Sequence, residues 1–113
     1  MDSDAPETAA QIDLYWRPGC GFCSSLRSQL DRLGIERVEH NIWEESDAAA
    51  VVRRHADGNE TVPTVVIGGV GMVNPSARAL ATHLVEHARH LLPDGFEAPQ
   101  PSAASRAVGK IFR

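Results

Sequence analysis

The chain has 113 residues, 42% of them hydrophobic, and a formal net charge of −4 at pH 7. This length suits one small domain, and the apolar content is enough for a modest core without disulfides or a structural metal. The acidic balance argues against nucleic acid and against an anionic membrane surface as partners. The longest apolar stretch, residues 65–73, is far shorter than the roughly 20 residues that a membrane span requires.

Residues 1–10 are acidic and polar, and they have the composition of a disordered tail. They lack the basic region and the apolar core of a signal peptide. The chain has two cysteines, and disulfides in a reducing compartment are usually transient and catalytic. We therefore expect a cytoplasmic protein.

The first half of the chain predicts two strands and two helices. Residues 11–16 alternate apolar and polar side chains, as a strand does, and end at a Pro-Gly turn. From residue 21, apolar side chains recur at positions 22, 26, 30 and 33, and Gly34 stands where a helix ends. Residues 35–42 predict a short second strand. Residues 44–56 begin with acids and end with arginines, which suits a helix dipole.

The second half predicts a hairpin and a third helix. Residues 61–73 contain two β segments joined by a Gly-Gly turn. Asn74 is expected to cap the next helix, with Pro75 at its first position and an apolar stripe running to Leu91.

The resulting order, β-α-β-α-β-β-α, predicts an α/β fold of the thioredoxin-like type, with a four-stranded mixed sheet flanked by three helices. This domain spans residues 11–92. Residues 93–113 are expected to form a C-terminal tail, mobile or with a short helix over residues 102–111.

Cys20 and Cys23 are the only cysteines, and they lie between the first strand and the first helix. A Cys-x-x-Cys pair at such a junction is typical of a thiol–disulfide redox site, because the free N–H groups of the helix N-terminus favour the thiolate. Cys20 precedes the helix and is expected to be the nucleophile, with Arg17 adding positive charge. Cys23 lies in the first turn and is expected to resolve the intermediate. A zinc site is disfavoured, since it needs about two more ligands.

The chain resembles the glutaredoxins, and most closely the mycoredoxin branch, over residues 11–92. Tyr15 and Arg17 stand five and three residues before the first cysteine, as in glutaredoxins. Gly21 is typical of mycoredoxins, whereas most glutaredoxins have proline there. Phe22 stands where mycoredoxins more often have tyrosine.

Two further motifs support this resemblance. Thr61-Val62-Pro63 is similar to the glutaredoxin Thr-Val-Pro element, whose proline is cis. Asn74 begins the Asn-Pro-Ser sequence that mycoredoxins carry after their last strand. By analogy with related folds, the backbone of Val62 is expected to face the active-site sulfur and to pair with an extended substrate. The resemblance thus implies a substrate-binding set of Arg17, Phe22, Thr61, Val62, Pro63 and Asn74.

The resemblance implies a thiol–disulfide oxidoreductase that reduces mixed disulfides between proteins and mycothiol, with glutathione as the alternative small thiol. Its electrons are expected from an NADPH-dependent disulfide reductase, and we expect a monomer with no bound cofactor or metal. One alternative is a ribonucleotide-reductase-type electron donor reduced by thioredoxin reductase, although such proteins tend to have Val-Gln between the cysteines. Another is a non-enzymatic redox-sensing or iron–sulfur thiol module, although cluster carriers usually have one active-site cysteine.

Several residues also have plainer interpretations. Arg17 is also consistent with a solvated loop residue, and Phe22 with a helix core position, since it begins the apolar stripe. Trp16 and Trp43 are interpreted as packing residues at the ends of elements. Three helical histidines are interpreted as a solvated flank rather than a metal site: His83, His87 and His90.

Overall fold

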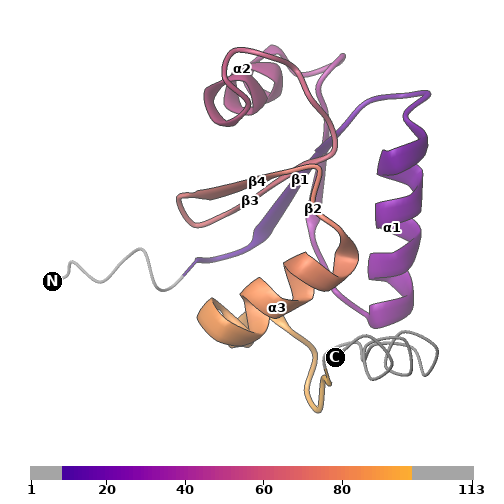
Figure 1. The fold of residues 1–113 in the computed structure, drawn as a ribbon, viewed down its shortest axis with the longest axis vertical. Helices are drawn as coiled ribbons and strands as arrows, with labels where there is room; N and C mark the ends of the chain where they lie inside the picture. The colour runs from indigo at the N-terminus through magenta and orange to yellow at the C-terminus, as the bar shows by residue number, and fades with distance from the viewer. Residues whose placement is uncertain (1–8, 98–113) are drawn as a thin grey trace, which may run out of the picture.

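The computed structural model describes residues 9–97 and contains a four-stranded mixed sheet with helices on both faces (Figure 1). The strand order is β2-β1-β3-β4, in which β1 and β2 are parallel and the other neighbours are antiparallel. This confirms the predicted thioredoxin-like α/β fold. Its elements in chain order are β1 (Ile12–Trp16), α1 (Gly21–Leu33), β2 (Val38–Asn41), α2 (Ser46–His55), β3 (Thr64–Ile67), β4 (Val70–Val73), α3 (Ala77–His87) and the short 3-10 helix η2 (Arg89–Leu91).

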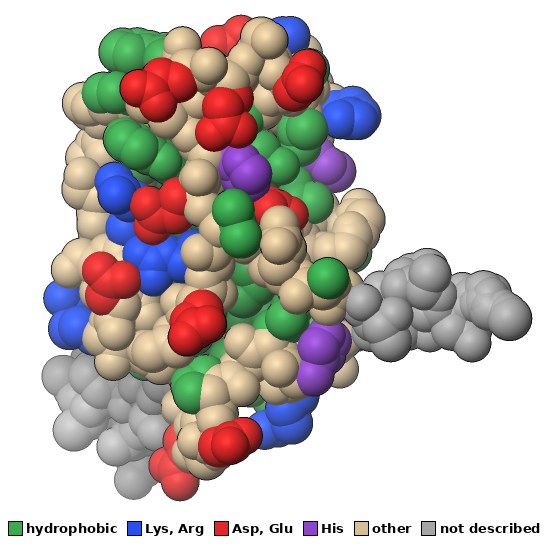
Figure 2. Space-filling view, turned by 180° about the vertical axis from the view of Figure 1, so that it is seen from behind, with side chains coloured by type: hydrophobic (Ala, Val, Ile, Leu, Met, Phe, Trp, Pro, Cys, Tyr) green, Lys and Arg blue, Asp and Glu red, His purple; other side chains and the backbone are tan. Residues whose placement is uncertain are grey.

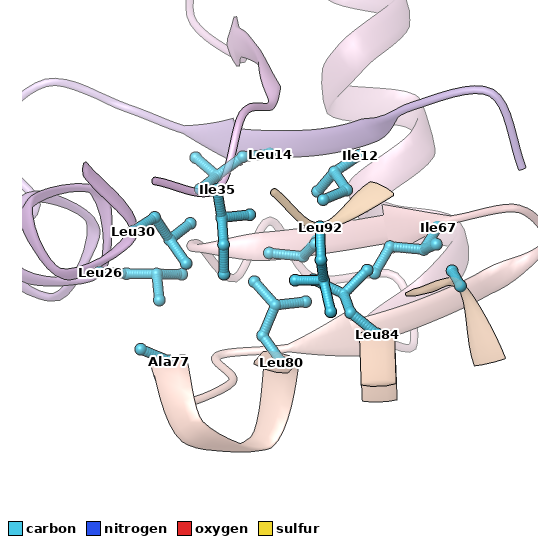
Figure 3. Packing of buried hydrophobic residues seen from close by; sticks show 12 residues of the cluster. Ile12, Leu14, Leu26, Leu30, Ile35, Ile67, Ala77, Leu80, Leu84 and Leu92 are labelled. Atoms are coloured by element: carbon cyan, nitrogen blue, oxygen red, sulfur yellow. The ribbon is translucent and has the colours of Figure 1, made fainter. Parts of the chain in front are cut away.

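Helices α1 and α3 cover one face of the sheet, and α2 covers the other (Figure 1). The two-residue period of the strands divides their side chains between the faces. In β1, Ile12 and Leu14 pack against α1 and α3, whereas Tyr15 packs with α2. Figure 3 shows Leu30 of α1 and Leu80 of α3 converging on the strand residues in the larger cluster.

Helix α1 begins and ends where the sequence predicts. Cys20 is its N-cap, and Gly34 is its C-cap with a φ of 74°, in the left-handed region that favours glycine. The Gly34 N–H donates to the carbonyl of Asp31 over 3.1 Å. Leu26 and Leu30 are buried as expected, but Phe22 is 72% exposed. The alternative in which Phe22 belongs to the helix core is therefore wrong.

Helix α3 begins later than predicted, with Ser76 rather than Asn74 as its N-cap. The Ser76 hydroxyl accepts a hydrogen bond from the Ala79 N–H over 3.0 Å. Asn74 instead adopts a φ of 52°, in a conformation that asparagine tolerates better than most residues. Its N–H donates to the Pro63 carbonyl over 2.7 Å, which ties the start of α3 to the loop before β3.

The surface mixes charge types, and Figure 2 shows acidic and basic side chains interspersed with apolar ones on the face seen from behind. Within residues 9–97, no helix combines the length and apolar character needed to span a bilayer. Ala9 packs against the larger core cluster, and its carbonyl accepts a hydrogen bond from His90 over 2.6 Å. Most of the two expected tails, including the short helix expected over residues 102–111, lies outside the described residues.

Candidate active site

Four chain segments meet at one edge of the sheet. Strand pairing places the last residues of β1 and β2 opposite each other, Trp16 with Asn41, and the first residue of β3 beside Tyr15. The last residue of β4, Val73, pairs with Thr64. Along this edge, in strand order, lie the segment after β2, the segment after β1 with Cys20, the loop before β3 and the segment after β4. We call this the active-site edge.

The Cys20 sulfur lies at the centre of this edge and makes two hydrogen bonds. Its Sγ accepts from the Cys23 N–H over 3.2 Å, because Cys20 is the N-cap residue of α1. The same thiol donates to the Val62 carbonyl at a sulfur–oxygen distance of 3.7 Å. The backbone of Val62 therefore faces the sulfur, as the resemblance implies. The N–H donor is placed to stabilise negative charge on Cys20 when its proton leaves.

Cys23 differs from Cys20 in its surroundings. Both side chains are free thiols, but Cys20 is 8% exposed and Cys23 only 1%. Burial, followed by a hydrogen bond with Cys20, raises the pKa of Cys23 to about 12. A backbone hydrogen bond from Arg17 and the positive charge of Arg17 oppose this rise in the Cys23 pKa without overcoming it. Cys20 is thus the more exposed residue of the pair, as expected, and the raised pKa of Cys23 disfavours its thiolate at neutral pH.

The loop before β3 connects the sulfur to the segment after β4. The Val62–Pro63 peptide bond is cis, as expected from the Thr-Val-Pro element. The Thr61 carbonyl accepts a hydrogen bond from the Thr64 hydroxyl over 2.8 Å, and the Pro63 carbonyl accepts from Asn74. The structure therefore joins these predicted binding residues in one hydrogen-bonded unit.

A groove lies between α1 and the start of α3, with a volume of about 250 Å³. Phe22 and Asn74, two of the predicted binding residues, both line it, whereas Arg17 and Val62 do not. Every side chain that lines it is uncharged, and hydroxyl and amide groups alternate with apolar ones. We call it the neutral groove; its lining residues are Phe22, Ser25, Leu26, Gln29, Asn74, Pro75, Ser76 and Ala77.

Arg17 lies on the opposite side of Cys20, beside Trp43. Its guanidinium donates to the Pro18 carbonyl over 3.1 Å and lies 5.7 Å from the centre of the Trp43 ring, a cation–π contact. Trp43 is 65% exposed, so its interpretation as a packing residue is wrong. Trp16 does pack against the larger cluster. The sequence motifs do not single out Trp43. Its position two residues after β2, at the active-site edge, is the observation that marks it as a candidate site residue.

The three helical histidines lie away from this edge. The rings of His83 and His87 are 4.8 Å apart and tilted by 42°, and His90 bonds to the carbonyl of Ala9. Among residues 9–97, no group of three or more His, Cys, Asp or Glu side chains is placed to hold a metal ion.

Comparison with known proteins decides the family. A family model for glutaredoxin matches residues 12–72, which is more than half of the chain. The chain belongs to the glutaredoxin family. Members of this family are thiol–disulfide oxidoreductases that act with low-molecular-weight thiols and protein disulfides. A comparison with curated protein sequences gives no match.

Solved glutaredoxin structures share the fold. The solution structure of glutaredoxin from Brucella melitensis is 25% identical, with a TM-score of 0.52, over 80% of this chain and 96% of that one. Reduced glutaredoxin C1 from Populus tremula x tremuloides is also 25% identical, with a TM-score of 0.50 and 80% of each chain covered. A buckwheat glutaredoxin–glutathione complex is 24% identical, with a TM-score of 0.51, over 73% of this chain and 76% of that one.

Proposed function

We propose that this glutaredoxin reduces mixed disulfides between proteins and mycothiol, with Cys20 as the nucleophile. The Cys20 thiolate attacks the sulfur of the small thiol, the mixed disulfide breaks, and the protein leaves as a thiolate that takes up a proton. Cys20 is then joined to mycothiol. A second mycothiol thiolate attacks the mycothiol sulfur, releases mycothiol disulfide and restores Cys20. An NADPH-dependent reductase returns the disulfide to two thiols, and a reducing compartment such as the cytoplasm suits this cycle.

The observation that supports mycothiol is the neutral groove, whose lining includes Phe22, two residues after Cys20. Mycothiol joins a cysteine derivative to two polyhydroxylated rings, which suit hydroxyl and amide partners and the face of an aromatic ring. Gln29 and Ser25 supply such groups and are hydrogen bonded to each other over 3.0 Å, and Phe22 presents an exposed ring. Glutathione carries two carboxylates and an ammonium group, and these gain most from charged partners. The uncharged lining therefore favours the polyol.

The test is a coupled assay on one peptide, prepared once as its mycothiol mixed disulfide and once as its glutathione mixed disulfide. Each substrate is supplied with its own thiol, its own disulfide reductase and NADPH, and NADPH oxidation is followed. We expect kcat/KM to be at least tenfold higher with mycothiol, and Cys20→Ser to abolish both activities. Equal or higher activity with glutathione contradicts the proposal. Turnover only with thioredoxin reductase would indicate the ribonucleotide-reductase-type donor instead.

The environment of Cys23 makes it dispensable when the small thiol is abundant. The raised pKa of Cys23 keeps its thiolate scarce at neutral pH, and millimolar mycothiol supplies a second route for clearing the adduct. We expect Cys23→Ser to retain activity within about threefold of the native chain in the same assay. Cys20→Ser is the matched control, since it makes the same atomic change one turn away. Loss of activity in Cys23→Ser with native activity in Cys20→Ser would reverse the two roles.

A further inference from the structure

We propose that Trp43 determines specificity for the protein half of the mixed disulfide, a proposal that rests on the proposed function of Cys20. The two sides of Cys20 along the active-site edge differ in chemistry. The segment after β4 supplies Asn74 to the neutral groove, while the segment after β2 presents Trp43 with Arg17 against it. Because the strand order is β2-β1-β3-β4, Cys20 lies between these two surfaces.

Occupation of the neutral groove by the small thiol leaves the other side of Cys20 to the protein half of the substrate. A thiolate attacks a disulfide along the S–S axis, so the leaving sulfur lies beyond the attacked one. If the small thiol occupies the neutral groove, its body fills the β4 side of Cys20. The groove is then closed to the polypeptide that carries the leaving sulfur, and the β2 side, where Trp43 is exposed, is left for it to contact.

Trp43 is held in place although its ring is exposed. The backbone N–H of Trp43 donates to the Asn41 side-chain oxygen over 2.9 Å. The backbone N–H groups of Glu44 and Glu45 donate to the Asn41 carbonyl over 3.0 Å each. The Arg17 guanidinium lies against the ring at 5.7 Å. Pre-positioned tryptophan and arginine side chains are the types that contribute most to protein–protein contacts, because they bury a large area at little entropic cost.

The occupant that fits this surface is an apolar side chain next to the modified cysteine of the substrate. The exposed indole offers an apolar ring, 65% exposed, to which such a side chain would pack. A small polar flanking residue would leave the ring in water. We therefore expect substrates with leucine beside the modified cysteine to react faster than substrates with serine there.

The experiment compares Trp43→Ala with the native chain on three mixed disulfides. Two are octapeptides that differ only in having leucine or serine on both sides of the modified cysteine, and the third is the mixed disulfide with 2-mercaptoethanol. For Trp43→Ala we expect kcat/KM to fall about tenfold on the leucine peptide, the size of a strong aromatic contact, and to change less than twofold on the other two. Trp43→Phe should keep most of the preference for leucine.

Val70→Ala is the matched control. Val70 is also an exposed apolar residue (48%), but it is the first residue of β4, at the end of that strand away from the active-site edge. It should leave all three rates unchanged. An equal fall in kcat/KM on all three substrates in Trp43→Ala would overturn the proposal. It would mean that Trp43 contributes to binding the small thiol or to the structure of its own loop. An unchanged preference for the leucine peptide in Trp43→Ala would also overturn the proposal.

Each substrate is prepared with mycothiol and with glutathione, so that the two proposals fail separately. The thiol preference of the native chain tests the proposed function, and the leucine-to-serine ratio tests Trp43 in whichever series turns over. If neither the mycothiol nor the glutathione substrates were turned over, both proposals would be overturned.

Discussion

The two faces of the sheet differ in what packs against them. The face under α1 and α3 is built from large aliphatic side chains, among them Leu30, Leu80 and Leu84, all fully buried (Figure 3). The cluster under α2 has fewer buried members within residues 9–97, and most are small: Ala48, Ala49, Val52 and Ala56, with the larger Tyr15 and Ile42. We call these the leucine face and the alanine face.

Each face also carries a charged cluster. On the leucine face, Arg37 pairs with Asp31 of α1 and with Glu39 of β2, and on the alanine face the cluster surrounds His40. His40 lies between two carboxylates, with Nε2 2.9 Å from Asp13 and Nδ1 3.2 Å from Glu45. Its ring stacks on Tyr15 at 4.8 Å between centres. Because Glu45 is the N-cap residue of α2, this cluster joins β1, β2 and the start of α2.

Each face supports a different part of the active-site edge. The leucine face holds α1 and α3 together, and these helices position Cys20 and the neutral groove. The alanine face anchors the segment between β2 and α2, which carries Trp43. Stability and small-thiol chemistry thus depend mainly on one face, and the segment proposed to contact protein substrates depends on the other.

The sharpest test of this comparison is one substitution made on each face. Val65 of β3 lies on the leucine face and Val52 of α2 on the alanine face, and both are 0% exposed. We expect Val65→Ala to lower the free energy of unfolding by about 2–3 kcal/mol, since the large neighbours leave a cavity and alanine suits a strand poorly. Val52→Ala should cost only about 1 kcal/mol, because alanine favours the helix.

Urea unfolding followed by circular dichroism measures both values. Equal losses would show that the two faces contribute alike despite their different side chains. A larger loss for Val52→Ala would reverse the comparison and make the alanine face the main source of stability.

The sequence predicts the order of elements well because each boundary has a local chemical cause. Helix α1 lies between a capping cysteine and Gly34, whose positive φ is a property of that residue and its neighbours. The alternation in β1 likewise follows from one strand having two different faces. Cys20, Val62 and the cis bond at Pro63 could be expected because a family motif carries them.

Other features depend on what lies opposite in space, and a linear pattern does not contain this information. Phe22 has helical spacing with Leu26, yet α1 begins beyond the edge of the sheet and leaves the ring in solvent. Asn74 and Ser76 are both good capping residues, and the hydrogen bond from Asn74 to Pro63 decides between them. The exposure of Trp43 follows from the position of β2 in the sheet.

The charged cluster of the alanine face gives the last and smallest prediction. Burial acts to lower the pKa of His40, but hydrogen bonds and charges from Asp13 and Glu45 outweigh it, so the pKa of His40 is raised above its usual value. A raised pKa means that the folded state binds the proton more tightly than the unfolded state. The resulting stability is fully present below about pH 6.5, the ordinary histidine value, and is lost as the pH rises through the folded-state pKa.

We therefore expect His40→Gln to destabilise the chain more at pH 5.5 than at pH 9, with a difference of about 0.5–1 kcal/mol in the free energy of unfolding, the usual range for partly exposed ion pairs. Urea unfolding at the two pH values measures it. His87→Gln is the matched control, since it makes the same change at an exposed position of α3 with 63% of the side chain in solvent. A loss in His40→Gln that is equal at both pH values would mean that His40 stabilises the alanine face through its stacking on Tyr15 rather than through its charge.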